Sequence, residues 1–167
     1  MTKKSSDRSI NFIGWFVLIL LLAMPEPSRG GDFEPGKPSK KDKCPVCGMF
    51  IHKYPDWRAE IIFKDGSFDF FDGAKDMFKY YLNLKKYNSG KTQKDIEAVY
   101  VTEYYDMTMI RAAKAYFVIG SDVYGPMGKE LIPFSNAPSA EVFLKDHSGK
   151  AILTFEAITP DLMRRLE

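Results

Sequence analysis

The pattern of apolar and polar positions after residue 43 alternates short strand-like runs with two helix-like runs. The first two strand-like runs cover residues 57–63 and 68–71, and a polar Asp65-Gly66 pair lies between them. Because glycine readily adopts the positive φ that a tight two-stranded turn requires, these residues predict a β-hairpin.

The next apolar positions recur at helical spacing, from Asp72 to about Leu84. Asp72 is expected to be the N-cap of this helix, because Asp side chains accept hydrogen bonds from the free backbone N–H groups of a first turn. Residues 96–102 predict a third strand, whereas residues 103–111 fit no single type.

The same order of elements recurs in the second part of the chain. The pattern there predicts a strand at residues 115–119, a turn at 120–122, a strand at 131–134, a helix at about 138–146 capped by Ser135 or Asn136, and a strand at 151–157. Residues 71–74 align loosely with residues 134–137. The repetition predicts an α+β fold of two related ββαβ halves with antiparallel sheets, at about residues 44–112 and 113–167.

The first 31 residues have a different pattern from the rest of the chain. Lys3, Lys4 and Arg8 precede an apolar run at residues 10–24, which is typical of a secretory signal peptide. No Ala-x-Ala cleavage site and no cysteine follow the run, so an uncleaved N-terminal membrane anchor is the alternative. Positive charge stays on the cytoplasmic side of a membrane, so both interpretations predict an exported, periplasmic or otherwise extracytoplasmic domain.

Composition and charge narrow the classes of function. We interpret residues 32–43, which are rich in Pro, Gly, Ser and Lys, as a flexible linker to a domain at residues 44–167. With 45% apolar and 14% aromatic residues, the chain can bury a core without many disulfides. The formal net charge of +2 comes entirely from residues 1–31. The remainder is neutral, which argues against a nucleic-acid-binding surface.

The two cysteines, Cys44 and Cys47, form a Cys-Pro-Val-Cys motif, and three kinds of site use such a pair. A redox pair attacks disulfides through a thiolate of lowered pKa. A zinc site needs further ligands, for which His52 and His147 are the histidines available. A soft-metal site would hold Cu(I), which sulfur ligands select over harder ions.

Two methionines favour the copper interpretation. Met49 follows Cys47 by two residues, with Gly48 between them, so a thiolate and a thioether could bind one Cu(I) ion. Met127 lies in a Gly-Pro-Met-Gly turn, where a thioether is exposed without packing. A redox pair needs neither thioether, although methionine also serves as a gap-filler in hydrophobic cores.

Three longer segments contain these motifs. They are CPVCGM at residues 44–49, AYFVIGSDVYGPMGKELIPF at residues 115–134, and AxxFLxDxxGKAILTFEAI at residues 140–158. Together they resemble the NosL family, the copper-binding accessory proteins of nitrous-oxide reductase, over residues 44–158. The resemblance implies a fold of two related ββαβ halves, similar to organomercurial lyase, in agreement with the repeat.

The resemblance further implies a Cu(I)-binding metallochaperone and not an enzyme, which delivers copper to nitrous-oxide reductase or its assembly machinery. By motif match the ligands would be Cys47, Met49 and Met127, and we add Cys44 as a second thiol that not every member has. Many members are lipoproteins with a lipidated cysteine after the leader. This chain has none there, so membrane contact would come from residues 10–24. The alternative function is a thiol-disulfide oxidoreductase that uses the two cysteines.

Four further side chains have both a structural and a functional interpretation. His52 is either an additional copper ligand or a surface histidine. His147 is expected at the end of a helix, where a cation suits the helix dipole. Met107 and Met109 form a Met-x-Met pair that could bind copper, but a strand would direct both to one face, towards the core.

Overall fold

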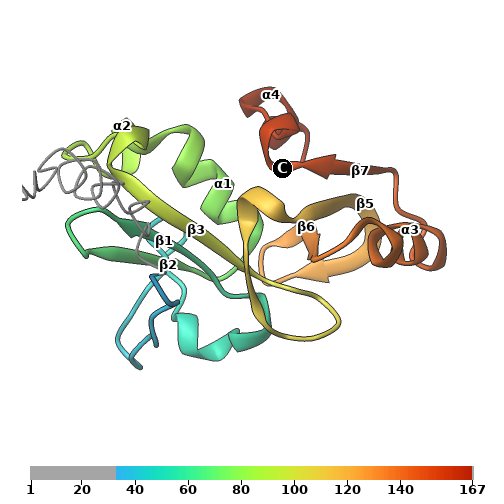
Figure 1. Ribbon diagram of the computed structural model, residues 1–167, viewed down its shortest axis with the longest axis horizontal. Coiled ribbons are helices and arrows are strands. Elements are labelled where there is room, and N and C mark those ends of the chain that lie inside the picture. Colours follow the sequence, from blue (N-terminus) through green and yellow to red (C-terminus); the bar gives the residue numbers. More distant parts are fainter. Residues whose placement is uncertain (1–32, 167) are drawn as a thin grey trace, which may run out of the picture. The chain divides into compact units, whose positions relative to one another are not determined.

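The computed structural model describes residues 33–166, which belong to one compact unit (Figure 1). The predicted signal peptide or anchor, with its apolar run at residues 10–24, lies outside the described residues. Among the residues that are described, no helix is both long and apolar enough to cross a membrane.

The segment before the cysteine pair contacts the first sheet at two points. The Tyr100 hydroxyl donates a 2.6 Å hydrogen bond to the carbonyl of Phe33, and the backbone N–H of Gly36 donates to the Glu60 carboxylate at 2.9 Å. These contacts lie within the predicted linker, at residues 32–43. The predicted boundaries of the linker and of the two halves stay predictions.

The first half of the fold contains a four-stranded antiparallel sheet with the strand order β2-β1-β3-β4. Its strands are β1 (Ala59–Phe63), β2 (Phe68–Phe71), β3 (Ile96–Thr102) and β4 (Met109–Arg111). The β1–β2 pairing confirms the predicted hairpin, and Gly66 in its turn has a φ of 82°. Strand β3 confirms the predicted third strand, and β4 ends the stretch that fitted no single type.

Helix α1 (Ala74–Leu82) follows β2, and the short α2 (Leu84–Tyr87) follows α1 after a break at Asn83. The predicted helix is confirmed, but its predicted cap is wrong. The N-cap is Gly73, and Asp72 lies one residue before it. The apolar spacing identified the helix correctly because it reflects the buried face. The cap was misassigned because Asp72 makes a tertiary contact instead.

The second half contains a three-stranded antiparallel sheet with the order β6-β5-β7. Its elements are β5 (Tyr116–Gly125), β6 (Gly128–Phe134), α3 (Ala137–Asp146), β7 (Ala151–Thr154) and a final α4 (Pro160–Arg165). Single-turn 3₁₀ helices connect elements in both halves: η2 (Ile51–Lys53), η3 (Pro55–Trp57), η4 (Gln93–Asp95), η5 (Ala112–Lys114) and η6 (Phe155–Ala157).

Two predictions for the second half need correction. The predicted turn at residues 120–122 is wrong, because β5 continues through it and only shifts register between Ile119 and Tyr124. Gly120, with a φ of 73°, accommodates this irregularity. The Gly-Ser-Asp sequence at residues 120–122 is typical of a turn, which explains the wrong prediction. The last predicted strand, residues 151–157, is also too long, because residues 155–157 form η6.

The two halves repeat one topology, which confirms the predicted α+β fold of two ββαβ units. In each half the first strand lies in the middle, between the second strand and the strand after the helix. Strands β2 and β6 end at Phe71 and Phe134, and helices α1 and α3 begin at Ala74 and Ala137. The loose alignment of residues 71–74 with residues 134–137 therefore matches the structure.

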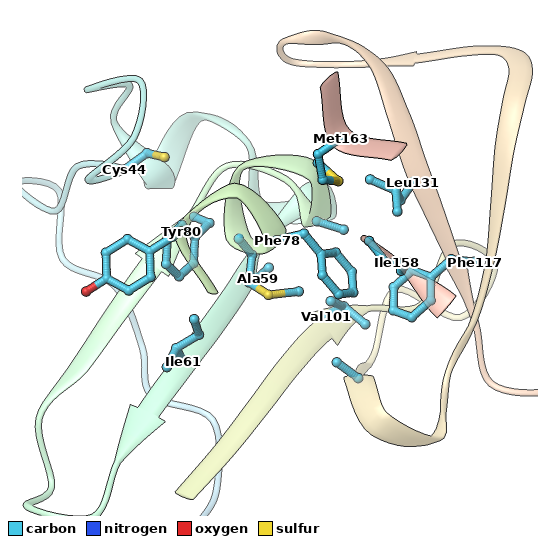
Figure 2. Packing of buried hydrophobic residues seen from close by; sticks show 14 of the residues in the cluster. Cys44, Ala59, Ile61, Phe78, Tyr80, Val101, Phe117, Leu131, Ile158 and Met163 are labelled. Atoms are coloured by element: carbon cyan, nitrogen blue, oxygen red, sulfur yellow. The ribbon is translucent and has the colours of Figure 1, made fainter. Parts of the chain in front are cut away.

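Helix α1 joins the two halves through a shared core. It lies against the first sheet in Figure 1, and its Phe78 packs on Phe117 of β5, with ring centroids 5.2 Å apart. Figure 2 shows Phe78 and Phe117 among buried residues from both halves, which also include Leu131 and Ile158. Cys44 belongs to the same buried cluster. The start of α1 is thus held between the two halves.

Candidate metal centre

The loop that carries the two cysteines closes on itself. The Cys44 N–H donates to the Met49 carbonyl, and the Gly48 N–H donates to the Cys44 carbonyl, both at 2.9 Å. Gly48 has a φ of 80°, a conformation that glycine adopts without strain. The loop therefore reverses the chain tightly, with both thiols on one short segment. Both cysteines are free thiols.

Two carboxylates at the start of α1 face this loop. The Cys47 thiol donates to Oδ1 of Asp72 at 3.2 Å, and the Cys44 thiol donates to Oδ2 of Asp76 at 3.5 Å. Asp76 belongs to the first turn of α1 and Asp72 immediately precedes the N-cap Gly73, so both negative charges lie near the helix N-terminus, where they are stabilised. Asp72 is therefore directed to a thiol and does not cap the helix, which explains the wrong cap.

These four side chains form a cluster that could hold a metal ion. One ligand atom from each of Cys44, Cys47, Asp72 and Asp76 lies within 4.8 Å of the others. All but the half-buried Cys47 are at most 2% exposed. Oδ2 of Asp72 has no hydrogen-bond partner among the described residues, and Oδ1 of Asp76 has only the ammonium of Lys79 at 3.8 Å. Buried carboxylate oxygens in this situation are candidates for a cation ligand.

Burial strongly affects both thiols. It raises the pKa of the Cys44 thiol far above its usual range, and the Asp72 carboxylate adds to this shift. Burial also raises the pKa of Cys47 to about 12, with the hydrogen bond to Asp72 as a further cause in the same direction. Both thiols therefore carry their protons at neutral pH. Reactive redox cysteines have the opposite shift, towards the thiolate.

The Met127 turn of the second half is attached to the same end of α1. Met127 is 43% exposed at the tip of the β5–β6 hairpin, as predicted for the Gly-Pro-Met-Gly turn. Its carbonyl accepts a 2.6 Å hydrogen bond from Nζ of Lys75, which is adjacent to Asp76 on α1. Met49 lies half-buried in the cysteine loop. The four predicted ligands thus belong to two segments that both contact the start of α1.

A buried glutamate completes this contact between the halves. Glu130 of β6 is 3% exposed, and its carboxylate accepts hydrogen bonds from the backbone N–H groups of Lys75 and Leu131. Burial raises the pKa of Glu130 to about 8. A Cβ at Gly73 would collide with Oε2 of Glu130, and one at Gly125 would lie 3.0 Å from the same oxygen. A side chain at Gly73 would therefore displace the Glu130 carboxyl group from this contact.

The remaining candidate residues lie outside the cluster. His52 is exposed, with its ring 5.8 Å from that of Phe50. His147 is the C-cap of α3, as predicted, and its Nδ1 lies 3.0 Å from Oδ1 of Asp122. The prediction that Met107 faces the core is wrong, because it occupies a turn with a φ of 54° and is 53% exposed.

Met109 lies in β4, and its sulfur accepts a 3.3 Å hydrogen bond from the Thr102 hydroxyl.

The sequence interpretation had not identified Asp72, Asp76, Lys75 or Glu130 as parts of the site. A signal for two of them was present, because Asp72 and Asp76 are two acidic residues close together at a predicted strand-to-helix junction. No comparable signal marked Lys75 and Glu130, which are 55 residues apart.

Comparison with known proteins gives a consistent result. A sequence model of the NosL family matches residues 35–163. The copper-binding lipoprotein NosL of Stutzerimonas stutzeri is 28% identical over 125 residues, which cover 74% of this chain and 65% of that relative. The match thus spans less than two thirds of that relative's length.

A solved structure is also similar to this fold. The crystal structure of the copper chaperone NosL from Shewanella denitrificans superposes with a TM-score of 0.66 at 26% sequence identity. The superposition covers 77% of this chain and 97% of that one. The family model extends over most of the chain and over both halves of the fold. The chain therefore belongs to the NosL family.

Proposed function

We propose that this protein is a copper carrier that acts outside the cytoplasm. It binds copper as Cu(I) at the start of α1 and transfers the ion to a copper enzyme, without catalysing a reaction itself. The observation that carries the proposal is the cluster of Cys44, Cys47, Asp72 and Asp76 within 4.8 Å. The named relatives, described as a copper-binding lipoprotein and a copper chaperone, support it.

The proposed ligands are Cys44, Cys47, Met49 and Met127. Thiolates and thioethers select Cu(I) over harder ions, and these four side chains come from two segments that meet at one helix end. The carboxylates of Asp72 and Asp76 accept the thiol hydrogen bonds in the metal-free protein. They can hold the thiols in place until the metal replaces the protons.

Transfer would proceed by ligand exchange. Each thiol must lose its proton to bind copper, so uptake releases protons and weakens as pH falls. The raised pKa of Cys47, about 12, keeps this competition active throughout the neutral range. An acceptor protein that supplies its own thiolate, thioether or imidazole donors could then displace one ligand at a time, and protonation of each released thiol would favour transfer.

The proposed recipient is nitrous-oxide reductase or its assembly machinery. An anchor formed by residues 10–24 would keep the carrier at the extracytoplasmic face of the membrane. Residues 32–167 carry no net charge, so recognition of the recipient must rest on local surface features and not on overall attraction. Transfer of copper from the loaded carrier to metal-free reductase, followed spectroscopically, tests this recipient.

A thiol-disulfide oxidoreductase is the alternative function, and the geometry disfavours it. Cys44 is 1% exposed, which leaves little access for a protein disulfide. Burial and the neighbouring carboxylates raise the pKa of both thiols, so neither is a ready nucleophile. Catalytic reduction of insulin disulfides by the wild-type protein would favour the oxidoreductase over the carrier.

The direct experiment is a competition for Cu(I) between the reduced protein and a strong chelator, without oxygen. Met49→Ala and Met127→Ala are expected to lose the competition at chelator concentrations that the wild-type protein withstands. Ser135→Ala, at the position of the second half that corresponds to Asp72, lies outside the proposed donor set and should behave as wild type. Unchanged competition in both methionine variants would refute the proposed donor set.

A further inference from the structure

Lys75 is a buried charged residue that the proposed donor set does not use. It is the second residue of α1 and is only 3% exposed. Both of its nitrogen atoms donate hydrogen bonds to the second half. The backbone N–H bonds the Glu130 carboxylate, and Nζ bonds the Met127 carbonyl at 2.6 Å. We call these two hydrogen bonds the Lys75 bridge.

A buried ammonium group is costly to keep, so its hydrogen bonds matter. Removing a charged group from water costs free energy that only hydrogen bonds or an opposite charge can offset. The partner of Nζ is a backbone carbonyl in an exposed hairpin tip, where Tyr124 is 64% exposed. The pairing of Tyr124 with Lys129 and of Gly125 with Gly128 joins the tip to its own hairpin but does not attach it to α1. The Lys75 bridge is therefore well placed to fix the Met127 turn.

The other end of the bridge is rigid. Glu130 accepts from two backbone N–H groups and is enclosed by Gly73 and Gly125, where a Cβ would meet its carboxylate. This contact fixes β6 against the first turn of α1. Glu130 lies three residues after Met127, so the fixed point is close to the Met127 turn. The same turn of α1 carries Asp76, whose carboxylate accepts from the Cys44 thiol.

We propose that Lys75 is a positioning residue for the copper site, which holds the Met127 turn at the start of α1 so that Met127 can join the cysteines as a ligand. This inference rests on the proposed function. Lys75 itself does not touch the ion. Its ammonium fixes the backbone of the turn, and the thioether of the same residue remains available to the metal.

The test is a double-mutant cycle on Cu(I) affinity, with Lys75→Met and Met127→Ala. Methionine keeps the apolar stem of Lys75 and removes the ammonium. Loss of a supporting hydrogen bond typically weakens metal binding by about 10-fold. We expect Lys75→Met to cause such a loss in the wild-type background and almost none in the Met127→Ala background.

Lys129→Met is the matched control, because it removes one positive charge from the same hairpin at an exposed position. It should bind Cu(I) as the wild type does. A purely electrostatic role of Lys75 would weaken or strengthen binding equally with and without Met127, and that additive result would overturn the inference. So would unchanged affinity in Lys75→Met, or in Met127→Ala alone.

A second measurement does not involve copper. Backbone hydrogen exchange in a peptide covering residues 125–129 should become faster in Lys75→Met but not in Lys129→Met, while exchange in β1 and β3 stays as in the wild type. Unchanged exchange at the turn would contradict a positioning role. If the wild-type protein does not compete for Cu(I) at all, the proposed function fails. Faster exchange at the turn would then still show that Lys75 holds the hairpin.

Discussion

The helices of the two halves begin at equivalent positions but satisfy their first N–H groups differently. In α3, the side chain of Asn136 accepts from the Ser139 N–H at 2.9 Å, a local cap within one turn. In α1, the equivalent residue is Gly73, which has no side chain to cap with, and the Lys75 N–H bonds Glu130 of the other half. The start of α1 is completed by tertiary structure.

This difference shows how a repeated unit can gain a site. Because Gly73 does not cap α1, Glu130 can enter, and the carboxylates of Asp72 and Asp76 are free to contact the thiols. The equivalents of these two residues in the second half are Ser135 and Ser139, which cannot supply charge. One helix start is thus a local structural feature, and the other is a candidate metal centre.

The largest expected effect is on copper binding by Cys47→Ser. A hydroxyl is a hard donor and a poor ligand for Cu(I), so affinity should fall by about 100-fold or more, beyond the usual loss from a supporting residue. Competition with a Cu(I) chelator measures it. The control Ser135→Ala, in the second half, should keep wild-type affinity. Equal Cu(I) affinity of Cys47→Ser and Ser135→Ala would mean that the start of α1 does not differ from the start of α3 in copper binding.

The next effect concerns stability and pH. The pKa of Glu130 is raised from 4.5 to about 8 in the folded protein, so the unfolded chain releases this proton first as pH rises. The contribution of Glu130 is therefore complete below pH 4.5 and is lost as pH approaches about 8. Glu130→Gln keeps an acceptor for Lys75 but does not titrate, so its unfolding free energy should fall less over this range.

Urea denaturation at several pH values in this range gives the free energy of unfolding of the wild type and of Glu130→Gln, and the two curves of free energy against pH are compared. Other titrating groups are shared, so their effects cancel in the comparison. Parallel curves would mean that Glu130 does not hold its proton in the folded state.

A smaller effect, on the pKa of Cys47, is expected when Asp72 is replaced by serine, the residue at the equivalent position of the second half. In Asp72→Ser, the Cys47 thiol loses the carboxylate that favours its protonated form, so its pKa should decrease from about 12. The absorbance of the thiolate, recorded against pH, reports this change. Ser135→Ala should leave the titration unaltered. A Cys47 pKa that stays the same or rises in Asp72→Ser would show that the hydrogen bond is not a cause of the shift.

The smallest effect is expected in the second half. Asn136→Ala removes the local cap of α3 and should lower the free energy of unfolding by about 1 kcal/mol, the typical value for a lost N-cap. Copper affinity should not change, because Asn136 caps α3 and belongs to neither of the two segments that supply the proposed ligands. Thermal unfolding and chelator competition check both statements. A marked loss of copper affinity would contradict the separation of roles.

Local patterns predicted the parts of the fold that depend on local interactions. The hairpin with Gly66, strand β3 and the Met127 turn all follow from side-chain alternation or from the conformational preferences of glycine and proline. The repeat was also visible, since Phe71 and Phe134 end equivalent strands. These features require no knowledge of which segments meet in space.

The errors arose where tertiary contacts override a local preference. Asp72 has the chemistry of a good N-cap, and only the position of the Cys47 thiol gives its carboxylate another partner. Gly120 looks like a turn residue but accommodates a register shift within a strand. The contact of Lys75 with Glu130 links residues 55 apart, which no local pattern reports.

X-ray absorption at the copper edge of the Cu(I)-loaded protein, compared between the wild type and Cys47→Ser, tests whether copper binds at the start of α1. A site at the start of α1 predicts a coordination shell dominated by sulfur in the wild type, with fewer sulfur neighbours or no bound copper in the variant. A shell of only nitrogen or oxygen, or one that Cys47→Ser leaves unchanged, would contradict a copper site built on the cysteine loop.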